Sequence, residues 1–271
     1  AKQYSFFFNG VGEFGSYEDA AKNPNIHAMY ICTPHYLHLE HTILATSNGK
    51  HVLIEKPIAC STDQEKQLIG SAKQAHVNLM IAENYRFMPA IRLCKKLVTE
   101  GEIGQIRVVK IQEESQYQLS GWRKDPDKNG GGAFIDAGIH KVHFLRYLMG
   151  EPSHIYALAV DTNVKDSLSE DGLLLVGKWI TGEIGLIYHS SSPINHSPYH
   201  RITLTGSHGT LNFNVGETQL QIDNNHQHRV IKIPGDPDGL LPMAQEFISS
   251  IRERRDPELP GEEGLKDLEL V

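Results

Sequence analysis

The sequence has few of the features that mark secreted, membrane or nucleic-acid-binding proteins. Its 271 residues include only three cysteines, Cys32, Cys60 and Cys94, an odd number without metal-ligand spacing, so neither a disulfide framework nor a zinc site is predicted. No apolar run approaches the roughly 18–20 residues that a membrane-spanning helix needs. The formal net charge is −7 and no long Lys/Arg cluster occurs, which argues against nucleic acid as a partner. The simplest interpretation is a reduced, cytoplasmic protein.

The hydrophobic pattern changes near Asn84, and the chain is long enough for two domains. Over residues 1–84, short strands alternate with helices, which predicts an α/β fold with a parallel, partial Rossmann-type sheet. Over residues 85–271, most strands alternate apolar and polar residues, which predicts an α+β domain built on a mainly antiparallel open sheet. The elements expected in the first domain are strands at 27–32, 51–55 and 78–83, and helices at 35–48 and 62–75.

A buried strand delivers an ionisable pair to the place where parallel sheets bind ligands. The run Val-Leu-Ile at residues 52–54 is wholly apolar, as in a strand covered on both faces. Glu55 and Lys56 follow directly, at the carboxyl end of the strand, where ligands sit in open parallel sheets. Pro57 has no N–H and restricts the backbone of Lys56, which helps to fix where that side chain points.

A second segment supplies an acid and a histidine. Three glycines at residues 130–132 precede a helix in which Asp136 and His140 stand four residues apart, on one face. Glycines let the backbone approach a ligand closely, which an ordinary helix start does not require. We therefore predict that Lys56, Asp136 and His140 converge on one proton-transfer site. The alternative is that Asp136 and His140 form an i,i+4 pair that only stabilises the helix.

Together these segments resemble the Gfo/Idh/MocA family of NAD(P)-dependent oxidoreductases, which includes glucose–fructose oxidoreductase and inositol dehydrogenase. The resemblance covers nearly the whole chain. It rests on the order and separation of five motifs, at residues 31–38, 55–57, 82–87, 122–123 and 130–140. It implies an enzyme that interconverts a secondary alcohol of a sugar or cyclitol and its ketone, with NAD or NADP as cofactor. It also implies a homo-oligomer that assembles through the antiparallel sheet.

The same resemblance implies a role for each predicted catalytic residue. His140 is the general base that takes the hydroxyl proton as hydride leaves for the nicotinamide. Asp136 binds a substrate hydroxyl. Lys56 lies beside the nicotinamide, where its charge polarises the substrate oxygen. His143 lies off this face of the helix and is expected to be structural.

Further residues are expected around the cofactor by resemblance. They are Thr33, Pro34, His38, Glu55, Lys56, Arg86, Trp122 and Arg123. An equal alternative for Glu55 is a structural partner for a nearby cation. Arg86 and the Trp122-Arg123 pair could equally be interdomain packing and salt-bridge residues. A metal site at His35, His38 and His41 is not predicted, because no carboxylate or cysteine completes a ligand shell.

One expected element is missing from the sequence. A complete dinucleotide-binding domain begins with a strand and a Gly-x-Gly-x-x-Gly turn, whose backbone amides hold the pyrophosphate. The nearest approach is Asn-Gly-Val-Gly at residues 9–12, in a loop context. The resemblance therefore implies that a first βαβ unit is absent, and residues 264–271 stop inside a helical pattern. We expect a chain truncated at both ends that binds dinucleotide weakly.

Two other classes of function stay open on the sequence. A catalytically silent relative could use the sheet domain to bind a ligand or partner, which the missing phosphate turn favours and the intact Lys56, Asp136 and His140 oppose. A metal-dependent hydrolase that uses the histidines is the third possibility. Neither the individual sugar nor the choice between NAD and NADP can be predicted.

Overall fold

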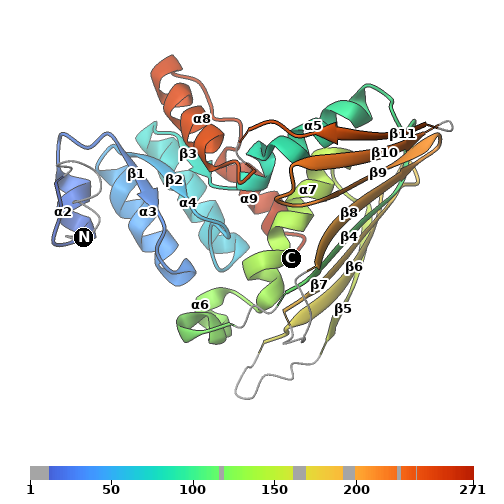
Figure 1. Ribbon diagram of the computed structural model, residues 1–271. Helices are drawn as coiled ribbons and strands as arrows, with labels where there is room; N and C mark the ends of the chain where they lie inside the picture. Colours follow the sequence, from blue (N-terminus) through green and yellow to red (C-terminus); the bar gives the residue numbers. More distant parts are fainter. Residues whose placement is uncertain (1–11, 116–118, 161–168, 192–198, 225–226, 236) are drawn as a thin grey trace.

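The computed structural model describes residues 12–115, 119–160, 169–191, 199–224, 227–235 and 237–271. A small sheet with its helices forms one end of the molecule, a large sheet forms the other, and helices fill the space between them (Figure 1). The Asn-Gly-Val-Gly stretch lies outside the described residues except for Gly12. None of the helices in the described ranges is long and apolar enough to cross a membrane.

The small sheet is parallel, as predicted. Its strands are β1 (Ala28–Ile31), β2 (His51–Ile54) and β3 (Leu79–Ile81), in the order β1-β2-β3. The helices of this part are α2 (Tyr17–Lys22), α3 (His38–Ser47), which follows the 3-10 turn η1 (His35–Leu37), and α4 (Thr62–Ala75). All three strands therefore present their carboxyl ends at one edge, where ligands bind in open parallel sheets.

Local capping explains where these helices begin and end. The Ser16 hydroxyl accepts a hydrogen bond from the Asp19 amide at 3.0 Å and starts α2. The Ser61 hydroxyl accepts one from the Gln64 amide at 3.3 Å and starts α4. His76, with φ of 55°, ends α4 in the left-handed conformation.

The large sheet is open and mostly antiparallel, which confirms the predicted fold class. It has eight strands in the order β11-β10-β9-β8-β4-β7-β6-β5, and only β4 and β7 run parallel among its described pairs. The strands are β4 (Ile106–Glu114), β5 (His154–Val160), β6 (Gly172–Lys178), β7 (Ile184–Ser190), β8 (Tyr199–Gly206), β9 (Gly209–Asn214), β10 (Gln219–Asn224) and β11 (Gln227–Lys232).

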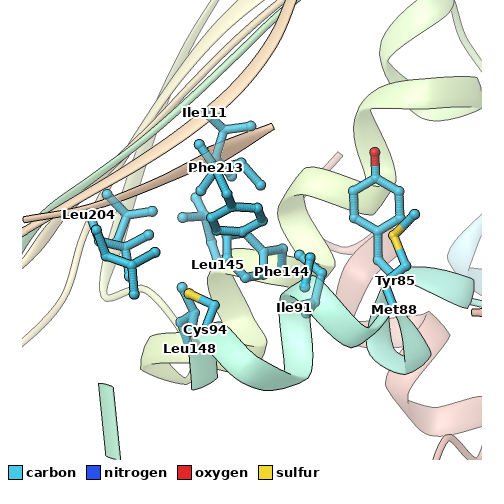
Figure 2. Packing of buried hydrophobic residues seen from close by; sticks show 14 of the residues in the cluster. Tyr85, Met88, Ile91, Cys94, Ile111, Phe144, Leu145, Leu148, Leu204 and Phe213 are labelled. Carbon is cyan, nitrogen blue, oxygen red and sulfur yellow. The ribbon is translucent and has the colours of Figure 1, made fainter. Parts of the chain in front are cut away.

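Two helices, α5 (Pro89–Thr99) and α7 (Ile139–Met149), cover one face of the large sheet. Figure 2 shows side chains from these helices, Ile91, Cys94 and Leu145 among them, packed towards Leu204 and Phe213 of the sheet. Most inner-facing residues of the central strands are apolar, as the alternating pattern requires. This core fixes α7 against the sheet and so fixes the residues that α7 carries. The short helix α6 (Pro126–Asn129) precedes it.

The segment of Asp136 departs from the regular helix that we expected. Residues Phe134–Gly138 form one π-helical turn, and the α-helix begins only at Ile139. The ring of Phe134 explains the need for Gly138, because a Cβ there would come within 2.2 Å of that ring. Single π turns inside helices are frequent at functional sites.

The last part of the chain returns to the small sheet. Helices α8 (Leu240–Glu253) and α9 (Gly261–Leu268) follow the large sheet, and the Ile81 amide donates to the Leu259 carbonyl at 3.0 Å. Met243, Phe247 and Leu259 are buried in the core that the small sheet forms. Residues after Asn84 therefore contribute to the core of the first domain, and the domain limit at Asn84 stays a prediction.

Two helical glycines provide a test of this C-terminal packing. A Cβ on Gly264 of α9 would come within 2.7 Å of the Glu65 carboxylate and within 3.0 Å of Ile58 and Ile81, whereas a Cβ on Gly70 of α4 meets nothing within 4 Å. We expect Gly264→Ala to lower the free energy of unfolding by about 1–3 kcal/mol. The matched Gly70→Ala should raise it by up to about 1 kcal/mol, because alanine is the better helix former. Chemical denaturation measures both, and equal effects would contradict the packing described.

Candidate active site

Lys56 and Asp136 meet where the carboxyl end of β2 faces the π turn. The Lys56 ammonium donates a hydrogen bond to the backbone carbonyl of Asp136 and lies 3.9 Å from its Oδ1. The Asp136 side chain is nearly buried, while that of Lys56 stays 17% exposed. The structure thus brings together two of the three residues predicted for the proton-transfer site, although 80 positions separate them in the chain.

Two further side chains hold the Asp136 carboxylate. Arg123 donates from Nε to Oδ2 at 3.2 Å, and His35 Nε2 lies 3.6 Å from Oδ1. Burial lowers the pKa of His35 to about 4, so its ring is neutral at neutral pH. Its Nδ1 lies 3.0 Å from the Asn129 carbonyl, and the same Asn129 donates to the Gly131 and Gly132 carbonyls. The glycine segment is thereby fastened beside the acid.

His140 is held by an acid that the sequence analysis did not single out. Its Nδ1 lies 2.7 and 2.8 Å from the two carboxylate oxygens of Glu83, which follows β3. The ring of Tyr85 stacks on the imidazole, with centroids 4.6 Å apart and planes 12° from parallel. Because a carboxylate only accepts hydrogen bonds, Nδ1 carries the proton and Nε2 keeps its lone pair. This tautomer is the one that a general base requires.

The charges of this pair follow from its surroundings. Burial alone would raise the pKa of the Glu83 carboxyl, but His140, the charge of His143 and the Tyr85 amide outweigh it and lower the pKa to about 2. Burial also lowers the pKa of His140, and the charge of Lys56 acts in the same direction against the attraction of Glu83. At neutral pH the pair is therefore an ionised carboxylate and a neutral imidazole.

A second polar group lies on the sheet side of Tyr85. Glu113 of β4 pairs in register with His189 of β7 and His200 of β8, so the three side chains form one row on the inner face. The buried ammonium of Lys141, from α7, contacts Glu113, and His200 Nε2 lies 3.4 Å from the Tyr85 hydroxyl. Of these residues, only Tyr85 lies within one of the five motifs of the family resemblance.

The turn after β1 is held together by a histidine. His38 is fully buried, and its ring nitrogens lie 2.8 Å from the Thr33 carbonyl and 2.9 Å from the Pro57 carbonyl. It therefore joins the turns that follow β1 and β2, instead of exposing its ring to a ligand. Thr33 and Pro34 are partly exposed at this edge, and the Thr33 hydroxyl lies 3.0 Å from His41 Nδ1.

The other residues expected at the cofactor cleft divide into two groups. The Glu55 carboxylate accepts a hydrogen bond from the Tyr30 hydroxyl at the edge of the small sheet. Arg86 donates to Glu258 at 3.0 Å and covers the Tyr147 ring. The Trp122 ring packs edge-on to the His35 ring, with centroids 4.6 Å apart, and the Arg123 guanidinium lies over the Trp122 ring. Arg123 thus contacts Asp136 directly and Trp122 packs on His35 beside it, whereas Arg86 is engaged by Glu258.

The remaining histidines of interest have separate partners. His143 Nδ1 lies 2.8 Å from Asp267 of α9, and His41 stacks on Tyr17. Among the described residues no group of three or more His, Cys, Asp or Glu is arranged to hold a metal ion. His143 therefore ties α7 to the C-terminal helix.

Comparison with known proteins identifies the class. Residues 5–83 match the model of the oxidoreductase family's NAD-binding Rossmann fold, and residues 95–271 match that of its C-terminal alpha/beta domain. The chain belongs to the Gfo/Idh/MocA oxidoreductase family.

Individual relatives show how far this likeness extends. The chain is 28% identical over 235 residues to levoglucosan dehydrogenase of Pseudarthrobacter phenanthrenivorans, which is 77% of this chain and 60% of that protein. It is 34% identical over 174 residues to trans-1,2-dihydrobenzene-1,2-diol dehydrogenase of Mus musculus, which is 62% of this chain and 52% of that protein. The matches thus span less than two thirds of either relative.

Solved structures share the fold. A levoglucosan dehydrogenase in complex with NADH and levoglucosan superposes with a TM-score of 0.89, at 23% identity, over 99% of this chain and 82% of that one. At this identity the likeness establishes the fold, including the small parallel sheet and the large open sheet.

The Glu83–His140 pair makes a prediction that needs no substrate. By 15N NMR, His140 should be neutral at pH 7 with the proton on Nδ1, because burial lowers its pKa and Glu83 holds that proton. Glu83→Gln should lower the pKa of His140 further and weaken the preference for this tautomer, because the attraction of the carboxylate is lost. Glu55→Gln removes another strand-end carboxylate and serves as the control. A His140 that titrates identically in all three proteins would refute the pairing.

Proposed function

We propose that this protein is an NAD- or NADP-dependent dehydrogenase that oxidises a secondary alcohol of a sugar or cyclitol to its ketone. The observation that carries the proposal is His140, a neutral imidazole whose Nδ1 is held by the ionised Glu83 and which lies within electrostatic reach of Lys56, the partner of Asp136. Dehydrogenases that act on hydroxyl groups, to judge from their names, are among its relatives.

The described residues fit the reactive end of a nicotinamide cofactor. The partly exposed Lys56, Thr33 and Pro34 stand at the carboxyl edge of the small sheet, where a dinucleotide binds in such folds. When bound, the nicotinamide would accept hydride from the carbon that bears the hydroxyl. Thr33, Pro34, Glu55 and Lys56 would border it, with His38 supporting the turn from below.

The protein supplies the proton chemistry. His140 Nε2 takes the hydroxyl proton, and the resulting imidazolium is stabilised by the Glu83 carboxylate on its other nitrogen. The Lys56 ammonium polarises the substrate oxygen and so favours loss of that proton. Asp136, fixed by Arg123, accepts a hydrogen bond from a neighbouring hydroxyl and orients the sugar.

Steady-state kinetics with a panel of polyols and cyclitols, at high concentrations of NAD and of NADP, tests the proposal. His140→Ala should lower turnover by roughly 10²–10⁴ and leave cofactor affinity nearly unchanged, since a positioned base is lost. Lys56→Ala should impair both, because Lys56 ends a strand of the cofactor-binding sheet. His208→Ala, at an exposed histidine in the turn between β8 and β9, is the control. No reduction of either cofactor with any polyol, or normal turnover of the His140 variant, would overturn the proposal.

We also propose that the protein forms a homo-oligomer through the outer face of the large sheet. Apolar side chains that alternate along β5, β6 and β7 point away from α5 and α7 and stand beside one another in register. Of these, Tyr156 is 65% and Leu158 is 50% exposed. A contiguous apolar face is typical of an interface, and an equal face on a second copy would cover it by sheet-on-sheet packing.

Charge substitution on this face tests the assembly. Tyr156→Lys and Leu158→Lys should each shift the protein towards the monomer in sedimentation velocity, because a lysine would be buried without a partner. Ile180→Lys, at a turn residue that is 93% exposed, should not. A wild-type protein that is monomeric at micromolar concentration would contradict the proposal.

A further inference from the structure

Glu113, His189 and His200 form a row of ionisable side chains that takes no part in the proposed proton transfer. Glu113 is paired in register with His189 on one neighbouring strand and with His200 on the other. Its oxygens lie 3.9 Å from His189 Nδ1 and 3.3 Å from His200 Nε2. Lys141 reaches the same carboxylate from α7 and also donates to the Ala137 carbonyl at 2.7 Å.

This row lies beside the proposed base. The Tyr85 ring is stacked on His140 at 4.6 Å, and its hydroxyl lies 3.4 Å from His200 Nε2. One tyrosine ring therefore separates the base from the row. The side chains of Glu113 and His200 are 15% and 22% exposed, much like the 15% of His140, whereas Lys141 and His189 are buried behind them.

The exposed members of the row can only accept hydrogen bonds from a ligand. Lys141, His200 and His189 outweigh the effect of burial and lower the pKa of Glu113 to about 2, so it is a carboxylate. Burial lowers the pKa of His200 to about 4, so its ring is neutral. With Glu113 an acceptor, the His200 proton belongs on Nε2, and its Nδ1 carries a lone pair.

We propose that Glu113 and His200 form a substrate subsite that accepts hydrogen bonds from hydroxyl groups remote from the reacting carbon and rejects carboxylates there. The inference rests on the proposed function and deepens it, because it restricts the substrate to neutral polyols whose far end bears hydroxyls. A substrate hydroxyl donates to Glu113 or to His200 Nδ1. A carboxylate in the same place would be repelled by the charge of Glu113, and neither Glu113 nor His200 Nδ1 could donate a proton to it.

Two substrates and one pair of variants test the subsite. The substrates are the best neutral polyol of the panel and its analogue without one remote hydroxyl. In Glu113→Gln, kcat/KM for the polyol should fall about 10- to 100-fold, the loss expected for a hydrogen bond to a charged group. The deoxy analogue should lose little, so the variant discriminates less between the two substrates. Glu114→Gln, the next residue of β4 and therefore on the opposite face of the sheet, is the matched control.

A third substrate, the analogue with a carboxylate at its remote end, gives a change of opposite sign. Its kcat/KM should rise in Glu113→Gln, because the repulsion is removed. A merely structural Glu113–Lys141 pair would lower kcat/KM equally for all three substrates, and that result would overturn the subsite. The subsite would be equally wrong if Glu113→Gln behaved like Glu114→Gln.

A second variant covers loss of folding, since Glu113→Gln leaves the buried Lys141 without its anion. His200→Phe keeps a ring beside Tyr85 and removes the acceptor at a more exposed position. It should weaken discrimination between the polyol and its deoxy analogue about 10-fold, and unchanged discrimination would refute the subsite. Failure of the proposed function itself is distinguishable, because the unaltered protein would then reduce neither cofactor with any polyol.

Discussion

The buried contact between Glu83 and His140 is the constraint on which the site depends. An ionised carboxylate that is 1% exposed survives only with partners for its oxygens. Both oxygens of Glu83 face the same imidazole nitrogen, and one also accepts from the Tyr85 amide. The end of β3 is thereby tied to α7. Movement of either element would leave the buried charge of Glu83 without a partner, so His140 is held at the small sheet.

Helix α7 makes buried ionic contacts of this kind with three parts of the structure. His140 reaches the small sheet, His143 and Arg146 reach Asp267 of α9, and Lys141 reaches Glu113 of the large sheet. A helix buried on nearly every side would ordinarily be apolar. Here its ionisable side chains are matched by carboxylates from three different parts of the structure. Such pairs add little net stability but penalise misplacement strongly, so α7 has one allowed position between the two sheets.

The sequence alone predicted the elements whose limits are set by neighbouring residues in the chain. The helix at 62–75 begins and ends where we expected, because Ser61 marks its start within the chain itself. Lys56 was found because a wholly apolar strand precedes it. Glu83 carries the same signal, a polar residue directly after the buried strand β3, and could have been found by the same reasoning.

Other features depend on contacts that no local pattern records. In the π turn at Phe134–Gly138, the Phe134 ring lies against Gly138, one turn further along the chain. The row of Glu113, His189 and His200 exists only through the register of three strands, two of them parallel and separated by about 75 positions. The burial of His38 likewise depends on Pro57 from the next strand. Residue types alone could not distinguish these histidines from one another.

The two acids of the site have different tasks because their surroundings differ. Glu83 is completely enclosed and has no exposed oxygen to offer a substrate, so it can act only through His140. Glu113 is equally ionised but partly exposed, and its cationic partner Lys141 lies behind it. In the mechanism that we propose, proton transfer thus depends on the contact between the small sheet and α7, while recognition of the far end of the substrate depends on the large sheet. Under the same proposal, substitutions of Glu113 or His200 change which polyol is accepted without moving His140, because the Tyr85 ring lies between them.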